Sequence, residues 1–386
     1  MKAAPVAFLF LGETLLIPHL FPIVESLADL RPDLPLDLWV STSTHAQLLA
    51  GWTAHLPQVR IRRAPGFRRL AATAPGERPV LPPKLPMLLR LAPALARTSI
   101  VVCAEQTSLW LPRAFPWLRK RFVKTSHGVG SMSARDDRRR MAATYTLVPS
   151  EQERATYLTR GMAPDRIEAT GYVKAAFRQR TPARALFPDD PFADDRPVLL
   201  YTPHWQAHRS SWPAWGPQVV EQLGAQRDWN VILAPHQRLI ERAPELRETL
   251  ARLADLPHVH VDLDSFATVD GSYTAAADLY LGDTSSQLVE FLAQPRPAVF
   301  LNAHARAWED DPAYAMWRAG EVVDDLSDLL PALARAPARH ADFAATQHAI
   351  ATAALGDASG AGARRAAEAV LRVLAADGRS RVLANT

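Results

Sequence analysis

Histidines stand at the ends of three separate apolar runs of this 386-residue chain, where a buried strand would give way to a loop. His127 is the first, and the glycines that follow it, Gly128 and Gly130, leave room for a substrate beside its ring. His204 and His236 follow two later runs, each beside a proline. Because histidine titrates near neutral pH and serves as a general acid or base, the three positions together predict a shared catalytic site, with His127 as the base. A single one of them would more commonly be a hydrogen-bonded loop residue.

The stretch from 277 to 303 has a pattern that could bind an anion. It reads as an apolar run, a Gly-Asp-Thr-Ser-Ser turn, a helical segment from Gln287 to Ala293 and a second apolar run. Ser285 or Ser286 can cap the helix, and the unpaired backbone N–H groups at its start favour a phosphate. A capped crossover between two strands, with no ligand, fits the same pattern.

Signatures of several enzyme classes are absent. No Walker sequence, no Gly-x-Gly-x-x-Gly fingerprint after a strand and no Gly-x-Ser-x-Gly elbow occurs. His204 and His208 have metal-binding spacing, and Asp262 and Asp264 could add carboxylates. However, Pro203 favours a loop over a helix at the histidines, and the aspartates fit an alternating strand end. We therefore expect neither a metal ion nor an organic cofactor.

The composition is that of a globular protein large enough for two domains, with 48% apolar and 22% charged residues. Cys103 is the only cysteine, which excludes an intrachain disulfide framework and a cysteine-based zinc cluster. No apolar run is long enough to span a bilayer, and the first apolar run lacks a signal-peptide pattern. We expect a cytoplasmic protein, or one applied to the inner face of the cell membrane.

Basic residues are concentrated between Arg60 and Arg140, where 18 Lys or Arg face 4 Asp or Glu, although the whole chain carries a net charge of only +4. Such a segment attracts an anionic surface or substrate. The aromatic pattern of an RNA-binding sheet is missing, so we expect no nucleic-acid partner. The segment from Lys84 to Ala96 predicts either an amphipathic helix on anionic lipid or a helix partly buried in the first domain.

Apolar runs typical of buried strands alternate with helical patterns, which predicts parallel sheets covered by helices on both faces. In the first half the predicted strands are Val6–Leu11, Leu36–Ser41, Val59–Arg62, Ile100–Ala104, Phe122–Ser126, Tyr145–Val148 and Ile167–Thr170, with helical patterns at His19–Leu30, Met87–Ala96 and Glu151–Thr159. In the second half they are Val198–Tyr201, Val231–Ala234, Val259–Val261, Leu279–Leu281 and Ala298–Leu301.

The loop from Thr181 to Arg196 is rich in proline and aspartate and predicts an interdomain linker. The expected domains are a Rossmann-like acceptor domain over residues 1–185 and a Rossmann-like donor domain over residues 196–335. An alanine-rich helical tail over residues 336–386 is expected to pack back across both. Ligands of such sheets bind at the carboxyl ends of the strands.

In their order along the chain, these motifs resemble the CDP-glycerol glycerophosphotransferase family, the teichoic-acid type polymerases and primases. The likeness covers roughly Phe122 to Glu321. The matching segments are Ser126-His127-Gly128, Ser150-Glu151, Gly171-Tyr172-Val173, Tyr201-Thr202-Pro203-His204-Trp205, Pro235-His236, Asp283-Thr284-Ser285-Ser286, Glu290, Arg296-Pro297, Tyr314, Arg318 and Gly320. The chain departs from the family at Gln206, where a basic residue is usual, and in lacking the Pro and Lys that often follow the His-Gly turn.

The resemblance implies a GT-B fold, with two Rossmann-like doubly wound domains facing a central cleft, and a metal-independent transfer from a nucleotide-diphosphate donor, CDP-linked in this family, that binds as substrate. It implies that His127 deprotonates the acceptor hydroxyl and that His236 stabilises charge on the phosphate or leaving group. The implied donor-binding residues are Asp283, Thr284, Ser285, Ser286, Glu290, Pro203, His204 and Arg209. Gly12, Gly128 and Gly130 are expected on the acceptor side.

The implied function is transfer of glycerol phosphate, or a related polyol or sugar unit, to a hydroxyl of a cell-surface polymer or glycan precursor. The acceptor would be a polymer or a lipid-linked molecule. Other enzymes share the same donor geometry, so a nucleotide-sugar glycosyltransferase or a non-hydrolysing epimerase is the alternative. A basic scaffold at a membrane surface, without enzymatic activity, is a third possibility.

Overall fold

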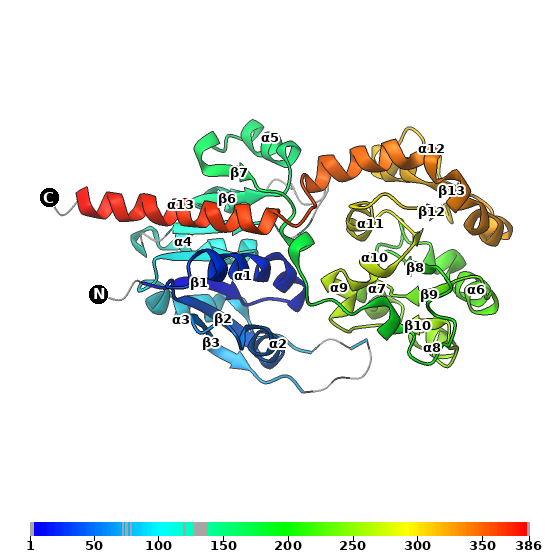
Figure 1. Ribbon diagram of the computed structural model, residues 1–386, viewed down its shortest axis with the longest axis horizontal. Helices are drawn as coiled ribbons and strands as arrows, with labels where there is room; N and C mark the ends of the chain where they lie inside the picture. Colours follow the sequence, from blue (N-terminus) through cyan, green and yellow to red (C-terminus); the bar gives the residue numbers. More distant parts are fainter. Residues whose placement is uncertain are drawn as a thin grey trace. The chain divides into compact units, whose positions relative to one another are not determined.

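The computed structural model describes residues 4–71, 73, 76–77, 79–118, 121–126, 128 and 138–383. The chain forms two compact α/β units (Figure 1). Unit 1 comprises Met1–Ala72, Pro79–Gln179 and Ala353–Thr386, and unit 2 comprises Thr73–Arg78 and Arg180–Thr352.

Unit 1 is built on a seven-stranded sheet in the order β3-β2-β1-β4-β5-β6-β7, and its paired strands are parallel. The strands are β1 (Val6–Phe10), β2 (Leu36–Thr42), β3 (Val59–Arg68), β4 (Ile100–Cys103), β5 (Arg121–Thr125), β6 (Tyr145–Val148) and β7 (Ile167–Ala169). The helices are α1 (Phe21–Leu30), α2 (Ser43–Thr53), α3 (Lys84–Leu95), α4 (Trp110–Ala114), α5 (Glu151–Thr159) and α13 (Gly362–Leu383).

Unit 2 contains a six-stranded sheet in the order β10-β9-β8-β11-β12-β13, again with parallel pairs. The strands are β8 (Val198–Thr202), β9 (Asn230–Leu233), β10 (Val259–Val261), β11 (Leu279–Gly282), β12 (Ala298–Leu301) and β13 (Glu321–Val323). The helices are α6 (Trp212–Ala225), α7 (Gln237–Arg242), α8 (Leu246–Ala251), α9 (Ala267–Asp270), α10 (Ser272–Ala276), α11 (Ser286–Phe291) and α12 (Leu329–Leu355).

Every strand predicted from the sequence is present, and both doubly wound sheets are confirmed. The central strands β1, β4, β8, β11 and β12 are buried along their whole length, which is why each reads as an unbroken apolar run. The prediction missed β13, a three-residue edge strand that begins at Glu321. A run of three residues that begins with a charged side chain is too short to show the apolar pattern of a strand.

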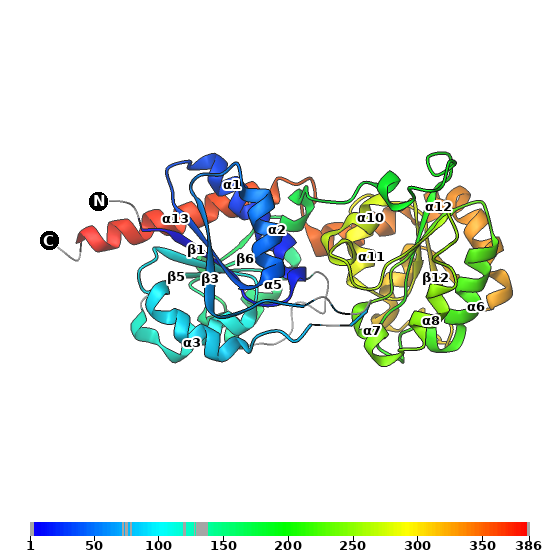
Figure 2. The same ribbon diagram turned by 90° about the horizontal axis from the view of Figure 1, so that it is seen from below.

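The C-terminal helices are divided between the two units. α12 packs Leu333 and Ala336 into the core of unit 2, and the Gln347 amide there donates to the carbonyls of Arg296 (2.8 Å) and Ala319 (2.7 Å). From Ala353 the chain returns to unit 1, where α13 lies beside α1 (Figures 1 and 2). The structural division therefore differs from the predicted tail over 336–386, because the first third of that tail, up to Thr352, belongs to unit 2.

The helix α3 is part of the core of unit 1. Met87, Leu88 and Leu91 are nearly fully buried there, whereas Leu85 and Leu89 are exposed by 45% and 42%. The helix is thus partly buried in unit 1, and the side that carries Leu85 and Leu89 is exposed. Among the described residues, no helix is both long and apolar enough to cross a membrane.

Candidate functional site

The loops that follow β8, β9 and β11 lie together at the carboxyl ends of the central strands in unit 2. Strand β8 lies between β9 and β11, and Thr202 pairs with Gly282 at the strand ends. The Asp283 carboxylate joins two of these loops: its Oδ2 accepts from the backbone N–H of His204 (2.8 Å) and of Ser211 (3.0 Å). The structure thus brings three of the sequence-predicted segments into one place.

Asp283 is fully buried, and burial raises its pKa to about 7 although hydrogen bonds from His204 and Ser211 act in the opposite direction. Its second oxygen, Oδ1, also accepts from the Ser211 N–H, at 3.1 Å. Both carboxylate oxygens are therefore occupied by backbone donors. Asp283 acts by holding the β8 and β11 loops in register, and its expected influence on a donor is indirect.

His204 and His236 form a cluster with Trp205. The ring centroids of the two histidines are 6.3 Å apart, and Trp205 stacks on His204 at 5.8 Å. The guanidinium groups of Arg238 and Arg242 lie over the Trp205 ring, at 5.1 and 4.6 Å from its centroid. These cation–π contacts fix the tryptophan and keep positive charge beside the histidines.

The hydrogen bonds of the two imidazoles determine which nitrogen faces a ligand. His204 Nδ1 accepts from the Gln206 N–H (3.1 Å), and His236 Nδ1 accepts from the Arg238 N–H (3.1 Å), where His236 caps α7. In the neutral ring the proton then sits on Nε2. Burial, with the charge of Arg209, lowers the pKa of His204 to about 4, so this ring is a neutral N–H donor at physiological pH.

The turn before α11 supplies hydroxyl groups to the same edge. Ser285 Oγ accepts from the Gln287 N–H (3.1 Å) and caps the helix, as predicted. The Thr284 hydroxyl is buried and has no hydrogen-bond partner among the described residues. The helix starts at Ser286 and ends at Phe291, shorter than the predicted Gln287–Ala293. An anion at this turn would be bound by side-chain hydroxyls and nearby backbone N–H groups more than by the helix dipole.

The remaining donor-side candidates lie near this cluster or on α11. Pro203 is buried and accepts from the His236 N–H through its carbonyl (3.3 Å), which links the β8 loop to the β9 loop. Arg209 is half-buried and acts electrostatically on His204. Glu290 is half-buried on α11, one turn beyond Ser286. Among the described residues, no group of three His, Cys, Asp or Glu side chains is placed to hold a metal ion.

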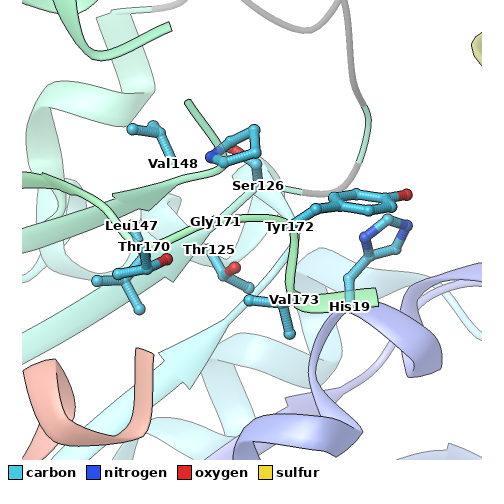
Figure 3. A pocket seen from close by; sticks show the side chains of 10 residues that line it. His19, Thr125, Ser126, Leu147, Val148, Thr170, Gly171, Tyr172 and Val173 are labelled. Atoms are coloured by element: carbon cyan, nitrogen blue, oxygen red, sulfur yellow. The ribbon is translucent and has the colours of Figure 1, made fainter. Parts of the chain in front are cut away.

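On the acceptor side, the candidates His127 and Gly130 lie outside the described residues, and Gly128 is described only as a bend. Their neighbour Ser126 donates to Glu153 Oε1 at 3.0 Å. Ser126 also lines a small cavity, of about 10 Å³, with His19 and Tyr172 (Figure 3). The volume is about that needed for one water molecule.

Figure 3 shows the rings of His19 and Tyr172 beside each other, and their centroids are 5.9 Å apart. His19 ends the short 3₁₀ helix that follows β1, and it is buried. In the sequence His19 begins the helical pattern His19–Leu30, which predicted no chemical role for it. Its signal was present, since it is a histidine a few residues beyond a buried strand.

A charged group near Gly12 was also missed. Glu105 follows β4, forms an ion pair with Lys84, and lies so near Gly12 that a Cβ there would be 1.9 Å from Glu105 Oε1. Lys124, at the end of β5, is fully buried, and burial lowers its pKa to about 7. Neither the Glu105 carboxylate nor the Lys124 amine was predicted as a site residue, although both stand at strand ends.

Comparison with solved structures finds the same fold elsewhere. The wall teichoic acid polymerase TagF, in a structure with CDPG soaked in, is similar with a TM-score of 0.62 and 12% identity over 98% of this chain and 90% of that one. The UDP-GlcNAc 2-epimerase from Neisseria meningitidis, bound to UDP-GlcNAc, gives 0.59 and 12% over 96% and 99%. The UDP-GlcNAc 2-epimerase from Methanocaldococcus jannaschii gives 0.59 and 14% over 96% and 99%.

No family model and no curated protein matches the sequence. The structural likeness extends over nearly the whole chain and includes both parallel sheets. The chain has the GT-B fold.

Proposed function

We propose that the protein is a transferase that moves glycerol phosphate, or a related polyol or sugar unit, from a CDP-linked donor to a hydroxyl of a cell-surface polymer or glycan precursor. The observation that carries the proposal is the cluster in unit 2, where His204, His236 and the Thr284–Ser286 turn lie at one sheet edge. The similarity in fold between this chain and a teichoic acid polymerase supports the proposal.

The cluster suits a pyrophosphate because its donors are neutral or cationic and partly shielded from water. The Nε2–H groups of His204 and His236, the Thr284 hydroxyl and Ser286 would bind phosphate oxygens, with Arg209 adding positive charge. Glu290 would accept hydrogen bonds from the ribose hydroxyls. The unpartnered Thr284 hydroxyl is explained by this role, because a buried hydroxyl without a partner costs stability.

In the proposed reaction, the acceptor hydroxyl oxygen attacks the phosphorus atom that bears the glycerol, and its proton passes to His127. The bond from that phosphorus to CMP breaks, and CMP leaves with the bonding electrons. His236 stabilises the charge that develops on the leaving phosphate. The step needs no metal ion and no redox partner.

An epimerase acting on a nucleotide sugar is the second candidate, because UDP-GlcNAc 2-epimerases share the fold and because Glu105 places a buried carboxylate at the end of β4. A scaffold without activity is the third. A thermal-shift series with CDP-glycerol, CDP-ribitol, UDP-GlcNAc and UDP separates them. The transferase proposal expects stabilisation by the CDP-linked compounds alone, UDP-GlcNAc alone would favour the epimerase, and no response to any nucleotide would favour the scaffold.

His236→Ala, compared with His348→Ala, tests the donor site directly. His348 is an exposed histidine on α12 in the same unit, so both variants lose one imidazole. We expect the CDP-glycerol shift to fall in the first variant and to stay unchanged in the second. Equal shifts in both would remove His236 from the donor site.

We also propose that the enzyme is peripheral at the inner face of a membrane, where a lipid-linked acceptor would lie. Leu85 and Leu89 are exposed on α3, and so is the neighbouring Arg90. Exposed leucines beside cationic side chains suit an anionic lipid surface.

A further inference from the structure

Arg209 is a half-buried cation in the loop that follows β8. Among the described residues, its guanidinium forms no ion pair and no hydrogen bond. Burial and the charge of Arg209 lower the pKa of His204, so the guanidinium lies near the ring of that histidine. It is therefore available for an anionic ligand at the same place as the histidine N–H groups.

The backbone around Arg209 is closed into a tight turn. The N–H groups of Arg209 and Ser210 both donate to the Gln206 carbonyl, each at 2.9 Å. The next N–H, that of Ser211, donates to the Asp283 carboxylate. These bonds fasten the turn to the β11 loop, but they leave the carbonyls on either side of Arg209 to be satisfied elsewhere.

Two side chains from the connection between β12 and β13 bond those two carbonyls. His304 Nε2 lies 3.0 Å from the Ser210 carbonyl oxygen. The Tyr314 hydroxyl donates to the His208 carbonyl at 3.2 Å. Because a carbonyl only accepts, Nε2 of His304 carries the proton and donates it. Arg209 thus stands between two carbonyls that are held from the same connection.

The loop that carries His304 is fixed by its own hydrogen bonds. The buried Asn302 side chain accepts from the Arg306 N–H at 2.8 Å and donates to the Arg306 carbonyl at 3.0 Å. Ala305 has a φ of 47°, in the left-handed region that alanine rarely adopts. Such strain persists where the surroundings fix the backbone, commonly at functional sites. His304 itself is exposed, so its bond to the Arg209 turn, and not core packing, is its contribution.

We propose that His304 and Tyr314 are positioning residues that hold Arg209 ready for the phosphate groups of the donor. Neither side chain would touch the ligand. Both fix the turn, so that the guanidinium need not be ordered when the ligand binds. This role rests on the donor site proposed above, and it makes the connection after β12 a part of that site.

Titration calorimetry of the full chain with inorganic pyrophosphate and with CDP-glycerol tests the role. Arg209→Ala is expected to weaken both ligands by about tenfold or more, through the loss of a charged hydrogen bond. His304→Ala and Tyr314→Phe should each weaken both about three- to tenfold, because the released arginine must then be ordered on binding. His304→Gln keeps an N–H donor and should bind like the wild type.

The double variant His304→Ala/Arg209→Ala separates positioning from a general structural effect. If His304 acts through Arg209, the double variant should bind no more weakly than Arg209→Ala alone. His340→Ala is the matched control, because His340 Nε2 also lies 3.0 Å from its hydrogen-bond partner, the Gln347 side chain on the same helix of unit 2. Its affinity should equal that of the wild type.

Unchanged affinity in His304→Ala or Tyr314→Phe, or additive losses in the double variant, would overturn the positioning role. If the protein binds pyrophosphate but not CDP-glycerol, and the variants keep the expected order, the proposed transferase activity fails and the positioning role is supported. A wild type that binds neither ligand would overturn both.

Discussion

The buried carboxylate of Asp283 should make the stability of unit 2 depend on pH in an unusual direction. Burial raises its pKa from 3.8 to about 7, so between these values the folded state holds a proton that the unfolded state releases. The free energy of unfolding therefore falls as pH rises from about 4 to about 7, and levels off above. Most paired carboxylates act the other way, because their pKa is lowered on folding.

Asp283→Asn removes the titration and keeps one oxygen to accept from His204 and Ser211. For a single group with these two pKa values, linkage gives a loss of about 2–3 kcal/mol in the free energy of unfolding between pH 5 and pH 8. The wild type should lose this amount more than the variant over that interval. Any fixed cost of the exchange is the same at both pH values and cancels in the comparison.

The assay is urea unfolding followed by tryptophan fluorescence at pH 5 and pH 8, for the wild type, Asp283→Asn and Asp325→Asn. Asp325 is an exposed cap whose pKa is lowered by hydrogen bonds from Ser327, so its stabilisation is lost only as pH falls through the acidic range. Asp325→Asn should therefore follow the wild type. If all three proteins change in parallel, Asp283 is ionised throughout and our account of the loop is wrong.

Three further predictions follow from particular contacts. Gly12→Ala places a Cβ against Glu105 and should separate Glu105 from Lys84, which lowers the melting temperature. Gly51→Ala lies in open space on α2 and should stabilise the protein by about 0.5–1 kcal/mol. If Gly12→Ala stabilised the protein and Gly51→Ala destabilised it, the packing described here would be refuted. Glu290→Gln should raise the Kd of CDP-glycerol about tenfold by calorimetry, the loss of one charged hydrogen bond, and an unchanged Kd would exclude the ribose contact. Leu89→Glu should reduce sedimentation with anionic liposomes, whereas Phe192→Glu, at a still more exposed apolar residue on unit 2, should not. Binding unaffected by either variant would remove α3 from the membrane surface.

The fold was predictable because its central strands are buried on both faces. Apolar runs such as the one that becomes β1 contain no polar residue. Where such runs alternate with helical patterns along the chain, they indicate a parallel sheet. The capped turn at Ser285 was predictable for a local reason, since the hydroxyl and the N–H that it accepts lie two residues apart. The edge strand β13 carried neither signal.

The candidate site was predictable only in part, because sequence order does not give side-chain partners. The histidines at the ends of β8 and β9 indicated which loops meet. The role of Asp283 depends on Ser211, far along the chain from it, and no local pattern shows that both of its oxygens are taken by backbone donors. Likewise, the approach of Glu105 to Gly12 follows from the pairing of β1 with β4.

The division of the C-terminal helices was hidden for a similar reason. The alanine-rich stretch from 336 onward has one helical composition throughout, so its pattern cannot indicate which core each part enters. The structure places Ala336 in the core of unit 2 and buries Ala366 in unit 1.

A crystal structure with CDP-glycerol soaked in tests the central proposal most directly. We expect the pyrophosphate oxygens within hydrogen-bond distance of Nε2 of His204 and His236 and of the Thr284 hydroxyl, and the ribose hydroxyls against Glu290. Clear density for the nucleotide at another place, or crystals that bind UDP-GlcNAc at this cluster and leave CDP-glycerol unbound, would contradict it.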